Sequence, residues 1–345
     1  MRLSFAAALV QAAILLFAAL AAAQARDPPG ILLSPGLAAL KSPLSADQVA
    51  TYTQQLASSG RFTNTDEFCG QAHIQCGATA SSLAFNSCTR MSRRRRLLDD
   101  TILQCRNKHA AEAVTTLELF FTRFSDMQPG NTITVSEPEL LGSRLSTSRS
   151  FLPKPISDLL PMSVNKLPSV LSTLDIASTS DMATAMATNL QMCTDKDPKG
   201  FNDRTCSFSL EDLTSFVTSR LGTSTPKAME FFYDATIVDQ PLTILSLDLV
   251  SPAGTKQYSC HTMSFAFTAQ YCHNLPSTNI YKMSASVTDK TSGKTTTYDN
   301  LGVSCHLDTS GFSPNHPAML KLNIKPGQGE VCHLLVNAVV YATPS

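Results

Sequence analysis

Four of the seven histidines in this 345-residue chain directly follow a cysteine. Gaps of 10, 31 and 25 residues separate the resulting dipeptides, which are Cys260-His261, Cys272-His273, Cys305-His306 and Cys332-His333. Neighbouring side chains on an extended strand point to opposite faces. A dipeptide on a strand therefore directs its sulfur to one face and its imidazole to the other. The sulfurs can form disulfides while the imidazoles face a pocket.

The imidazoles are the candidate metal ligands of the chain: His261, His273, His306 and His333. Imidazoles without a thiolate suit Cu(II) or Zn(II), and copper generally binds such sites more tightly. We therefore predict copper, with zinc less favoured. A closed Cys₂His₂ zinc site is disfavoured, because an adjacent Cys and His do not easily bind one tetrahedral ion. The alternative is that the dipeptides form only disulfides beside exposed histidines.

The compartment follows from residues 1–25, which combine Arg2, an apolar run from Leu3 to Ala23 and a small-residue ending. These are the parts of a secretory signal peptide, although an uncleaved membrane anchor is the alternative. No later segment is apolar enough to span a membrane. The mature protein is expected outside the cytosol.

Ten cysteines in a chain that enters an oxidising compartment indicate disulfides. Spacing alone leaves the connectivity open, except that Cys193 and Cys206 flank a turn-rich segment. A disulfide between them would close a short loop and contribute about 3 kcal/mol. We expect disulfides to involve six cysteines in particular: Cys193, Cys206, Cys260, Cys272, Cys305 and Cys332.

The charge balance argues against nucleic acid as a partner. The chain has 27 basic and 27 acidic residues, a formal net charge of zero. Nucleic-acid binding needs a basic face or stripe. Binding sites for the phosphates of nucleotides, and the motifs of serine hydrolases, are likewise not found in the sequence.

Residues 26–116 are predicted to form a linker followed by a small cysteine-containing region. Within it, Arg93, Arg94, Arg95 and Arg96 precede two leucines, so that residues 93–98 are either a solvated surface run or a site for a processing protease. If Cys88 pairs with Cys105, a disulfide would hold the halves together after a cut.

The remaining chain, residues 117–345, predicts an α+β fold in which helices precede a mainly antiparallel β-sheet domain stapled by disulfides. Capping signals predict helices over 45–58 and 209–221, the second ending before Gly222, and a further helix is expected over 178–192. Strands are expected over 229–237, 242–250, 258–271, 280–288, 295–306, 319–324 and 331–341.

The segment between the first two dipeptides alternates apolar and polar residues and contains no Gly, Pro, Asn or Asp. A straight strand there would separate its ends by about 40 Å. Cys260 could not then bond to Cys272, nor could His261 and His273 share an ion. A bend in the segment is the alternative.

The chain resembles the BURP-domain family of plants, whose signature is four Cys-His dipeptides with ten residues between the first two. Further residues carry the resemblance, including Phe120-Phe121, Asp126 to Gly130, and Ser209 to Glu211 after Cys206. The chain departs from the family pattern in its longer second gap and in Phe312, where tryptophan is usual. His316 also falls at a family position, as either a partner of the metal ligands or a structural hydrogen-bonding residue.

The resemblance implies a fold, a metal and two functions. The family is associated with copper, and members include secreted seed and stress proteins and a non-catalytic subunit of a cell-wall polygalacturonase. A non-catalytic cell-wall protein is therefore the first expectation, with a wall polysaccharide as a partner. The resemblance implies a secreted, extracellular location in the apoplast or cell wall, or a vacuolar one. Other members are copper-dependent peptide cyclases that crosslink a Tyr or Trp side chain, which makes a peptide substrate the alternative. Whether the chain is an enzyme stays open.

Overall fold

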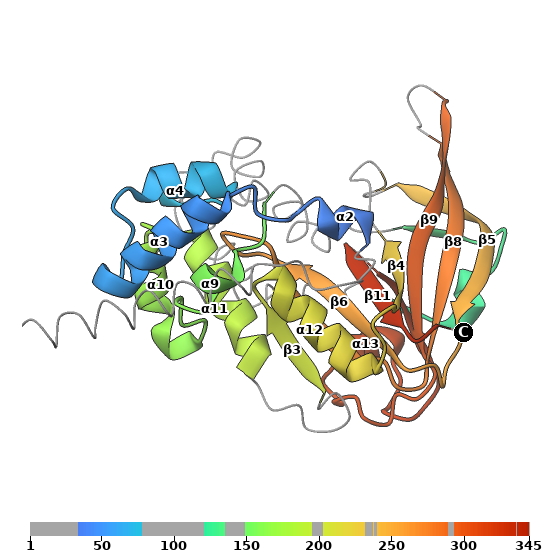
Figure 1. Ribbon diagram of the computed structural model, residues 1–345. Helices are drawn as coiled ribbons and strands as arrows, with labels where there is room; N and C mark the ends of the chain where they lie inside the picture. The colour runs from blue at the N-terminus through green and yellow to red at the C-terminus, as the bar shows by residue number, and fades with distance from the viewer. Residues whose placement is uncertain are drawn as a thin grey trace, which may run out of the picture.

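A computed structural model describes residues 34–77, 121–134, 149–194, 203–231, 237, 240–288, 293–335 and 337–344. The expected signal peptide, the arginine run and the cysteines Cys88 and Cys105 lie outside these residues. In the described part of the chain, no helix has the length and apolar character needed to cross a membrane. The helices and strands form a helical lobe beside two β-sheets (Figure 1).

The described α-helices are α2 (Pro35–Ala38), α3 (Ala46–Ser59), α4 (Thr65–Ala72), α9 (Lys154–Ser157), α10 (Leu167–Thr173), α11 (Asp181–Thr194), α12 (Leu210–Leu221) and α13 (Pro317–Leu322). Short 3₁₀ helices are η1 (Phe124–Met127) and η3 (Val164–Lys166). The predicted capping signals are confirmed in α3, where Ser45 and Gln48 form a capping box, and in α12, which begins after Ser209 and ends at a left-handed Gly222.

The helical lobe combines residues that precede and follow the undescribed segment 78–120. Its core joins Tyr52, Phe68 and other residues of α3 and α4 to residues of α9, α10 and α11. Tyr52 is buried, and its hydroxyl donates to Gln71 Oε1 at 2.8 Å. The N-terminal helices therefore share one core with the region expected to be the BURP domain.

Eleven strands are described, in two antiparallel sheets. The six-stranded sheet has the order β1 (Phe121–Thr122), β10 (Val331–Leu335), β9 (Thr295–His306), β8 (Thr278–Thr288), β5 (Pro241–Ser251) and β2 (Thr132–Thr134). The five-stranded sheet has the order β3 (Arg204–Ser207), β7 (Ala269–Asn274), β6 (Gln257–Met263), β11 (Ala338–Ala342) and β4 (Lys227–Phe231). The α+β expectation is confirmed.

The two sheets pack against each other through an apolar layer. Ile280 and Leu335 of the six-stranded sheet contact Phe231, Ala338 and Val340 of the five-stranded sheet. Gly302 of β9 is required here, because a Cβ at this position would lie 2.3 Å from the ring of Phe231. The opposite face of the five-stranded sheet is covered by α12 (Figure 1).

Three strand predictions are wrong. Residues 258–271 form two strands, β6 and β7, which pair as a hairpin instead of running straight. Residues 319–324 lie largely in α13, because Pro317 starts a helix that His316 caps and a left-handed Asn323 ends. Residues 331–341 form β10 and β11 in different sheets, separated near Asn337, whose φ is 45°.

The turn of the β6–β7 hairpin explains the first of these errors. Its residues Phe265, Ala266 and Phe267 are fully buried in the core of the helical lobe. Their backbone groups bond to partners from outside the hairpin: Ala266 O accepts from the backbone N–H of Gln75 at 2.7 Å, and Phe265 O accepts from Arg149. The turn needs no glycine or proline, because residues that are distant in sequence form hydrogen bonds with its backbone carbonyls.

Candidate functional site

Four disulfides occur among the described residues: Cys69–Cys76, Cys193–Cys206, Cys260–Cys272 and Cys305–Cys332. The bond between Cys193 and Cys206 is the pairing that the sequence favoured. The last two bonds use all four cysteines of the Cys-His dipeptides. These cysteines offer no thiolate, so the four dipeptides cannot form a Cys₂His₂ zinc site as they stand.

Two sites with the same register hold the four dipeptides. The first site comprises the Cys260–Cys272 disulfide with His261 and His273, on β6 and β7. The second site comprises the Cys305–Cys332 disulfide with His306 and His333, on β9 and β10. In each, the bonded cysteines are directly opposite one another, with Cα atoms 4.0 Å apart.

The disulfides and the histidines lie on opposite faces of their sheets. Cys260 and Cys272 pack against the apolar cluster that includes residues of α12. Cys305 and Cys332 belong to a separate apolar cluster of the six-stranded sheet, which is not the layer between the sheets. Side chains alternate along a strand, so the histidines lie on the other faces. Those faces carry Ala338, opposite His261, and Ile280, which belongs to the layer between the sheets. Both histidine pairs therefore lie on the sheet faces that meet each other.

In the first site, the rings of His261 and His273 are nearly parallel, with an interplanar angle of 7°. Their Nε2 atoms are 3.3 Å apart, and His261 Nε2 also lies 3.0 Å from Ser259 Oγ. His273 Nδ1 lies 3.0 Å from the carbonyl oxygen of Asn274. Because a carbonyl only accepts, Nδ1 of His273 carries the hydrogen and its Nε2 is left as an acceptor.

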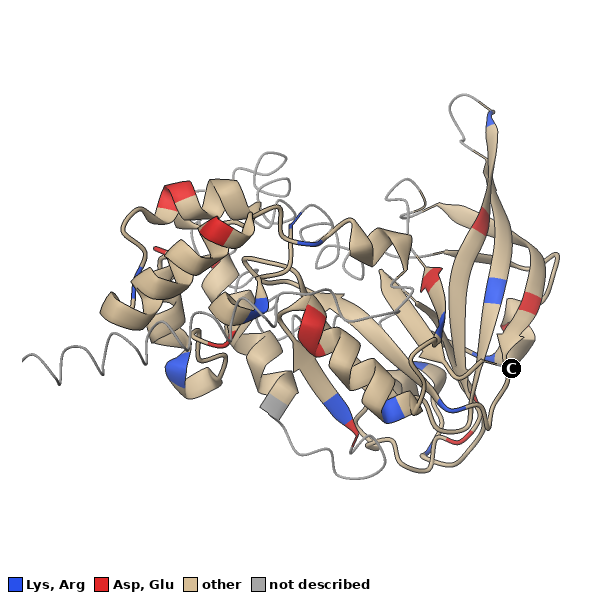
Figure 2. Ribbon diagram, in the orientation of Figure 1, with Lys and Arg blue, Asp and Glu red and all other residues tan. Residues whose placement is uncertain are grey.

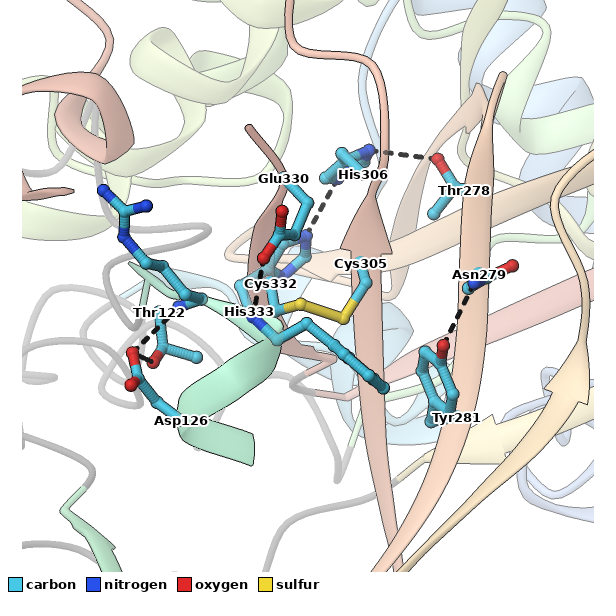
Figure 3. Close-up of a disulfide and its surroundings, with 12 residues drawn as sticks. Thr122, Asp126, Thr278, Asn279, Tyr281, Cys305, His306, Glu330, Cys332 and His333 are labelled. Carbon is cyan, nitrogen blue, oxygen red and sulfur yellow. Dashed lines mark hydrogen bonds between the residues drawn. A yellow bond between two sulfur atoms is a disulfide. The ribbon is translucent and has the colours of Figure 1, made fainter. Parts of the chain in front are cut away.

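The second site repeats this arrangement (Figure 3). The Nε2 atoms of His306 and His333 are 3.2 Å apart, and the rings are stacked at 21°. His333 Nδ1 donates to the carbonyl oxygen of Leu334 at 3.0 Å, so its Nε2 is again an acceptor. His306 Nδ1 lies 3.1 Å from Thr278 Oγ1. All four imidazoles are buried, with exposures of 2–7%.

Aromatic residues surround the second pair. The ring of Phe312 lies 5.6 Å from that of His306, and the ring of Phe121 lies 6.1 Å from that of His333. His316 contacts both phenylalanine rings and accepts a hydrogen bond at Nδ1 from the backbone N–H of Ala318. His316 therefore caps α13, which is the structural one of the two roles considered for it.

Comparison with known proteins agrees with this geometry. A family profile of the BURP domain matches residues 119–343. This chain belongs to the BURP-domain family. Among its relatives, BURP domain-containing protein 3 of Oryza sativa subsp. japonica is 31% identical over 225 residues, which are 63% of this chain and 48% of that protein.

Two further relatives bear names that refer to a cell-wall enzyme. Polygalacturonase 1 beta-like protein 3 of Arabidopsis thaliana is 32% identical over 190 residues, 54% of this chain and 29% of that protein. Polygalacturonase non-catalytic subunit AroGP2 of Solanum lycopersicum is 31% identical over 198 residues, 56% of this chain and 30% of that protein. The matched BURP region thus spans about half or less of the length of these relatives.

Each histidine pair of the BURP domain fits two positions around a transition-metal ion. Two nitrogens that both lie about 2.0–2.1 Å from one tetrahedral ion are about 3.3 Å apart. The observed Nε2–Nε2 distances are 3.3 and 3.2 Å. A backbone carbonyl at Nδ1, as for His273 and His333, is the usual partner that leaves Nε2 available for a metal.

The four histidines do not form one shared group in the described part of the BURP domain. No cluster of three or more His, Cys, Asp or Glu side chains there is placed to hold a metal ion. The two pairs therefore each supply two imidazoles, and within the described residues any further ligand would be of another kind. The structure brings His261 to His273 and His306 to His333, which sequence reasoning did not predict.

Sequence reasoning also missed Ser259, Ser304 and Thr278, which are fully buried on the histidine faces. Ser259 is opposite His273, and Ser304 is opposite His333. A signal for the serines was available: the tripeptide Ser-Cys-His occurs twice, at residues 259–261 and 304–306. Thr278, the first residue of β8, belongs to no comparable motif.

Proposed function

We propose that this chain is a secreted, non-catalytic protein of the plant cell wall that binds copper through its two histidine pairs. The observation that carries the proposal is the pair of facing Nε2 atoms in each site, held by a disulfide between the same two strands. Fixed imidazoles of this kind bind a metal without first being ordered, which lowers the free-energy cost of binding.

Copper is favoured over zinc by the ligands that remain. The disulfides remove the thiolates, and structural zinc sites usually have four protein ligands. Copper binds imidazole more tightly than zinc does. Other positions around the ion would be filled by groups other than His, Cys, Asp and Glu from the described residues. When bound, copper would supply Lewis acidity and one-electron redox chemistry to the layer between the sheets.

Two observations support an extracellular role beside a wall enzyme. Disulfides persist in oxidising compartments, and four are formed among the described residues. Relatives of the chain include proteins named as non-catalytic subunits of polygalacturonase. The burial of all four imidazoles favours a non-catalytic role over peptide crosslinking, because a Tyr side chain of a substrate would need to reach the layer between two packed sheets.

The metal proposal is tested on the secreted, disulfide-bonded chain after removal of metal. Copper should bind with electron paramagnetic resonance features of imidazole nitrogen, and the double variant His261→Gln/His306→Gln should lose this binding. His73→Asn is the matched control, because His73 is exposed at the end of α4. Wild-type protein that binds no copper, or a double variant that binds it normally, would refute the proposal.

The wall role is tested separately with a purified plant polygalacturonase. A stable complex in size-exclusion chromatography, with no change in the mass of added Tyr peptides, is the expected result. Loss of two hydrogens from such a peptide, dependent on copper, would instead identify a peptide cyclase.

A further inference from the structure

Strand β4 is the last described strand of the five-stranded sheet, and it lies close to both α2 and β9 (Figure 1). An open cavity of about 600 Å³ follows its outer edge. Ser34 and Pro35, at the start of α2, form one wall of this cavity. Val250, Lys282 and Asn300 of the six-stranded sheet form the other wall. The cavity is therefore a groove whose floor is the edge of β4.

The hydrogen bonds of β11 show which backbone groups of β4 face the groove. The backbone N–H of Thr343 donates to Lys256 O at 3.1 Å, on the β6 side of β11. Because successive residues of a strand bond to opposite neighbours, odd-numbered residues of β11 face β6 and even-numbered residues face β4. The even-numbered residues are opposite Lys227, Met229 and Phe231. The N–H and C=O groups of the other two residues of β4 therefore point away from β11, into the groove.

These two residues are Ala228 and Glu230. The side-chain amide of Asn300 donates to Glu230 O at 2.8 Å, in the direction from which a neighbouring strand would donate. Within the described residues, the N–H and C=O of Ala228 and the N–H of Glu230 have no partner on this side. An open strand edge of this kind pairs with extended peptides, because it offers a row of main-chain donors and acceptors.

Charged side chains give the two walls of the groove different character. Lys227 and Lys282 are exposed on the side of the six-stranded sheet. Lys227 Nζ donates to Val250 O at 3.0 Å, and Lys282 forms no ion pair with a described residue. The carboxylate of Glu230 faces α2, where its Oε1 accepts from the backbone N–H of Gly36 at 2.8 Å. An acidic side chain of a ligand would therefore be attracted to the wall that carries the lysines.

We propose that the edge of β4 binds an extended, acidic segment of a partner protein, which adds to the five-stranded sheet as a further strand. The walls on both sides favour a single segment over the edge strand of a second folded copy. A polysaccharide is disfavoured, because Phe231 is the one aromatic residue among the described lining and is 2% exposed, so no ring is available for stacking on a sugar. This inference goes beyond the proposed function and needs no metal.

The side chains of an added strand would point alternately to the two walls. Acidic residues would lie near Lys282, and apolar residues would lie near Pro35. The probe is therefore the fluorescein-labelled pentapeptide Val-Glu-Val-Glu-Val with blocked ends, which matches the length of β4. Its binding to the secreted, disulfide-bonded chain is measured by fluorescence polarisation in the presence of a metal chelator.

Two control peptides separate main-chain pairing from charge. The same pentapeptide with a methylated central backbone nitrogen should bind at least about tenfold more weakly, because it cannot donate to Ala228 O. Val-Lys-Val-Lys-Val should bind about 3–10-fold more weakly, the size expected when exposed charge pairs are lost.

Variants of the protein test the same two features. Ala228→Pro removes an N–H that faces the groove and leaves the bonds to β11 intact, and proline is tolerated on edge strands. It should abolish binding of the probe. Lys282→Glu should weaken binding about 3–10-fold. The control Lys166→Glu makes the same change of charge on the helical lobe and should have no effect. If Ala228→Pro does not fold, the methylated peptide makes the equivalent test on the wild-type chain.

Four outcomes would overturn the inference, whether or not the chain binds copper. The first is a wild-type chain that does not bind the probe, and the second is equal binding of the methylated peptide. The third is binding of an oligogalacturonate that Lys282→Glu weakens and Ala228→Pro spares, which would make the groove a polysaccharide site. The fourth is a dimer in size-exclusion chromatography that Ala228→Pro dissociates, which would make the occupant a second copy of this chain.

Discussion

Residues 264–268 join the two strands of the first site, whereas residues 307–330, which include α13, join those of the second. The short connection is buried in the core of the helical lobe. The long one places the half-buried rings of Phe312 and His316 beside the histidines. One pairing register and one disulfide geometry thus arise in two very different surroundings.

This difference distinguishes the features that set the distance between the paired histidines from those that set their hydrogen bonds. The register and the disulfide set the Nε2–Nε2 distance, which is nearly the same in both sites. Hydrogen-bond partners differ between the sites: they include Ser259 of β6 in the first and Thr278 of the neighbouring strand β8 in the second. The charged residues of the described elements are scattered along the ribbon (Figure 2).

The largest expected effect is on the buried turn of the first site. Phe267→Ala should destabilise the protein by about 3–5 kcal/mol, because the ring is fully buried in the helical lobe and its removal leaves a cavity. Urea unfolding followed by circular dichroism measures this change. Phe312→Ala, in the long connection of the second site, is the control and should cost less than half as much. Equal costs would show that the two connections are equally fixed.

Removing the disulfides should have the next largest effect. The bonds join residues 12 and 27 positions apart. Loop-closure entropy predicts a loss of about 3 kcal/mol for Cys260→Ala/Cys272→Ala and about 3.5 kcal/mol for Cys305→Ala/Cys332→Ala. The histidine alignment should suffer more in the second variant, because its strands have no short connection. Copper affinity that falls equally in both would contradict this asymmetry.

Local signals allowed several elements to be predicted from the sequence. The caps of α3 and α12 involve residues three positions apart, and β9 was predicted with its observed ends at 295 and 306. The turn at 264–268 was missed because its partners, Gln75 and Arg149, are distant in sequence. The pairing of His261 with His273 was missed for the same reason, since it depends on this turn.

Arg149, which contacts the turn of the first site, adds an energetic cost to that site alone. Its guanidinium donates to Phe265 O, but Nε and Nη2 have no partner among the described residues. Burial lowers the pKa of Arg149 to about 10. Arg149→Met should therefore stabilise the protein by roughly 1–2 kcal/mol, because a neutral side chain avoids the desolvation of an unpaired charge. Chemical denaturation at neutral pH measures this, and a loss of stability would mean that the charge is compensated.

The smallest effect is expected from a cut in the arginine run, Arg93 to Arg96, which stays a predicted processing site. Residues 34–77 bury Leu37, Tyr52 and Phe68 in cores shared with residues beyond the cut. They also bond across it, since the backbone N–H of Ser150 donates to His73 O at 3.0 Å and that of Gly77 donates to Leu174 O at 3.1 Å. The N-terminal piece should therefore stay bound after cleavage, even when disulfides between the pieces are absent.

A variant with Cys88 and Cys105 replaced by Ala tests this association without the possible disulfide between them. After cleavage by a protease specific for paired arginines, the two pieces should migrate together in size-exclusion chromatography and separate only in denaturant. The copper affinity of both sites should be unchanged, because the β6–β7 turn keeps its contacts with the N-terminal helices. Dissociation of the pieces in native buffer, followed by loss of copper from the first site before the second, would show that the covalent connection, and not packing, keeps the helical lobe on the turn.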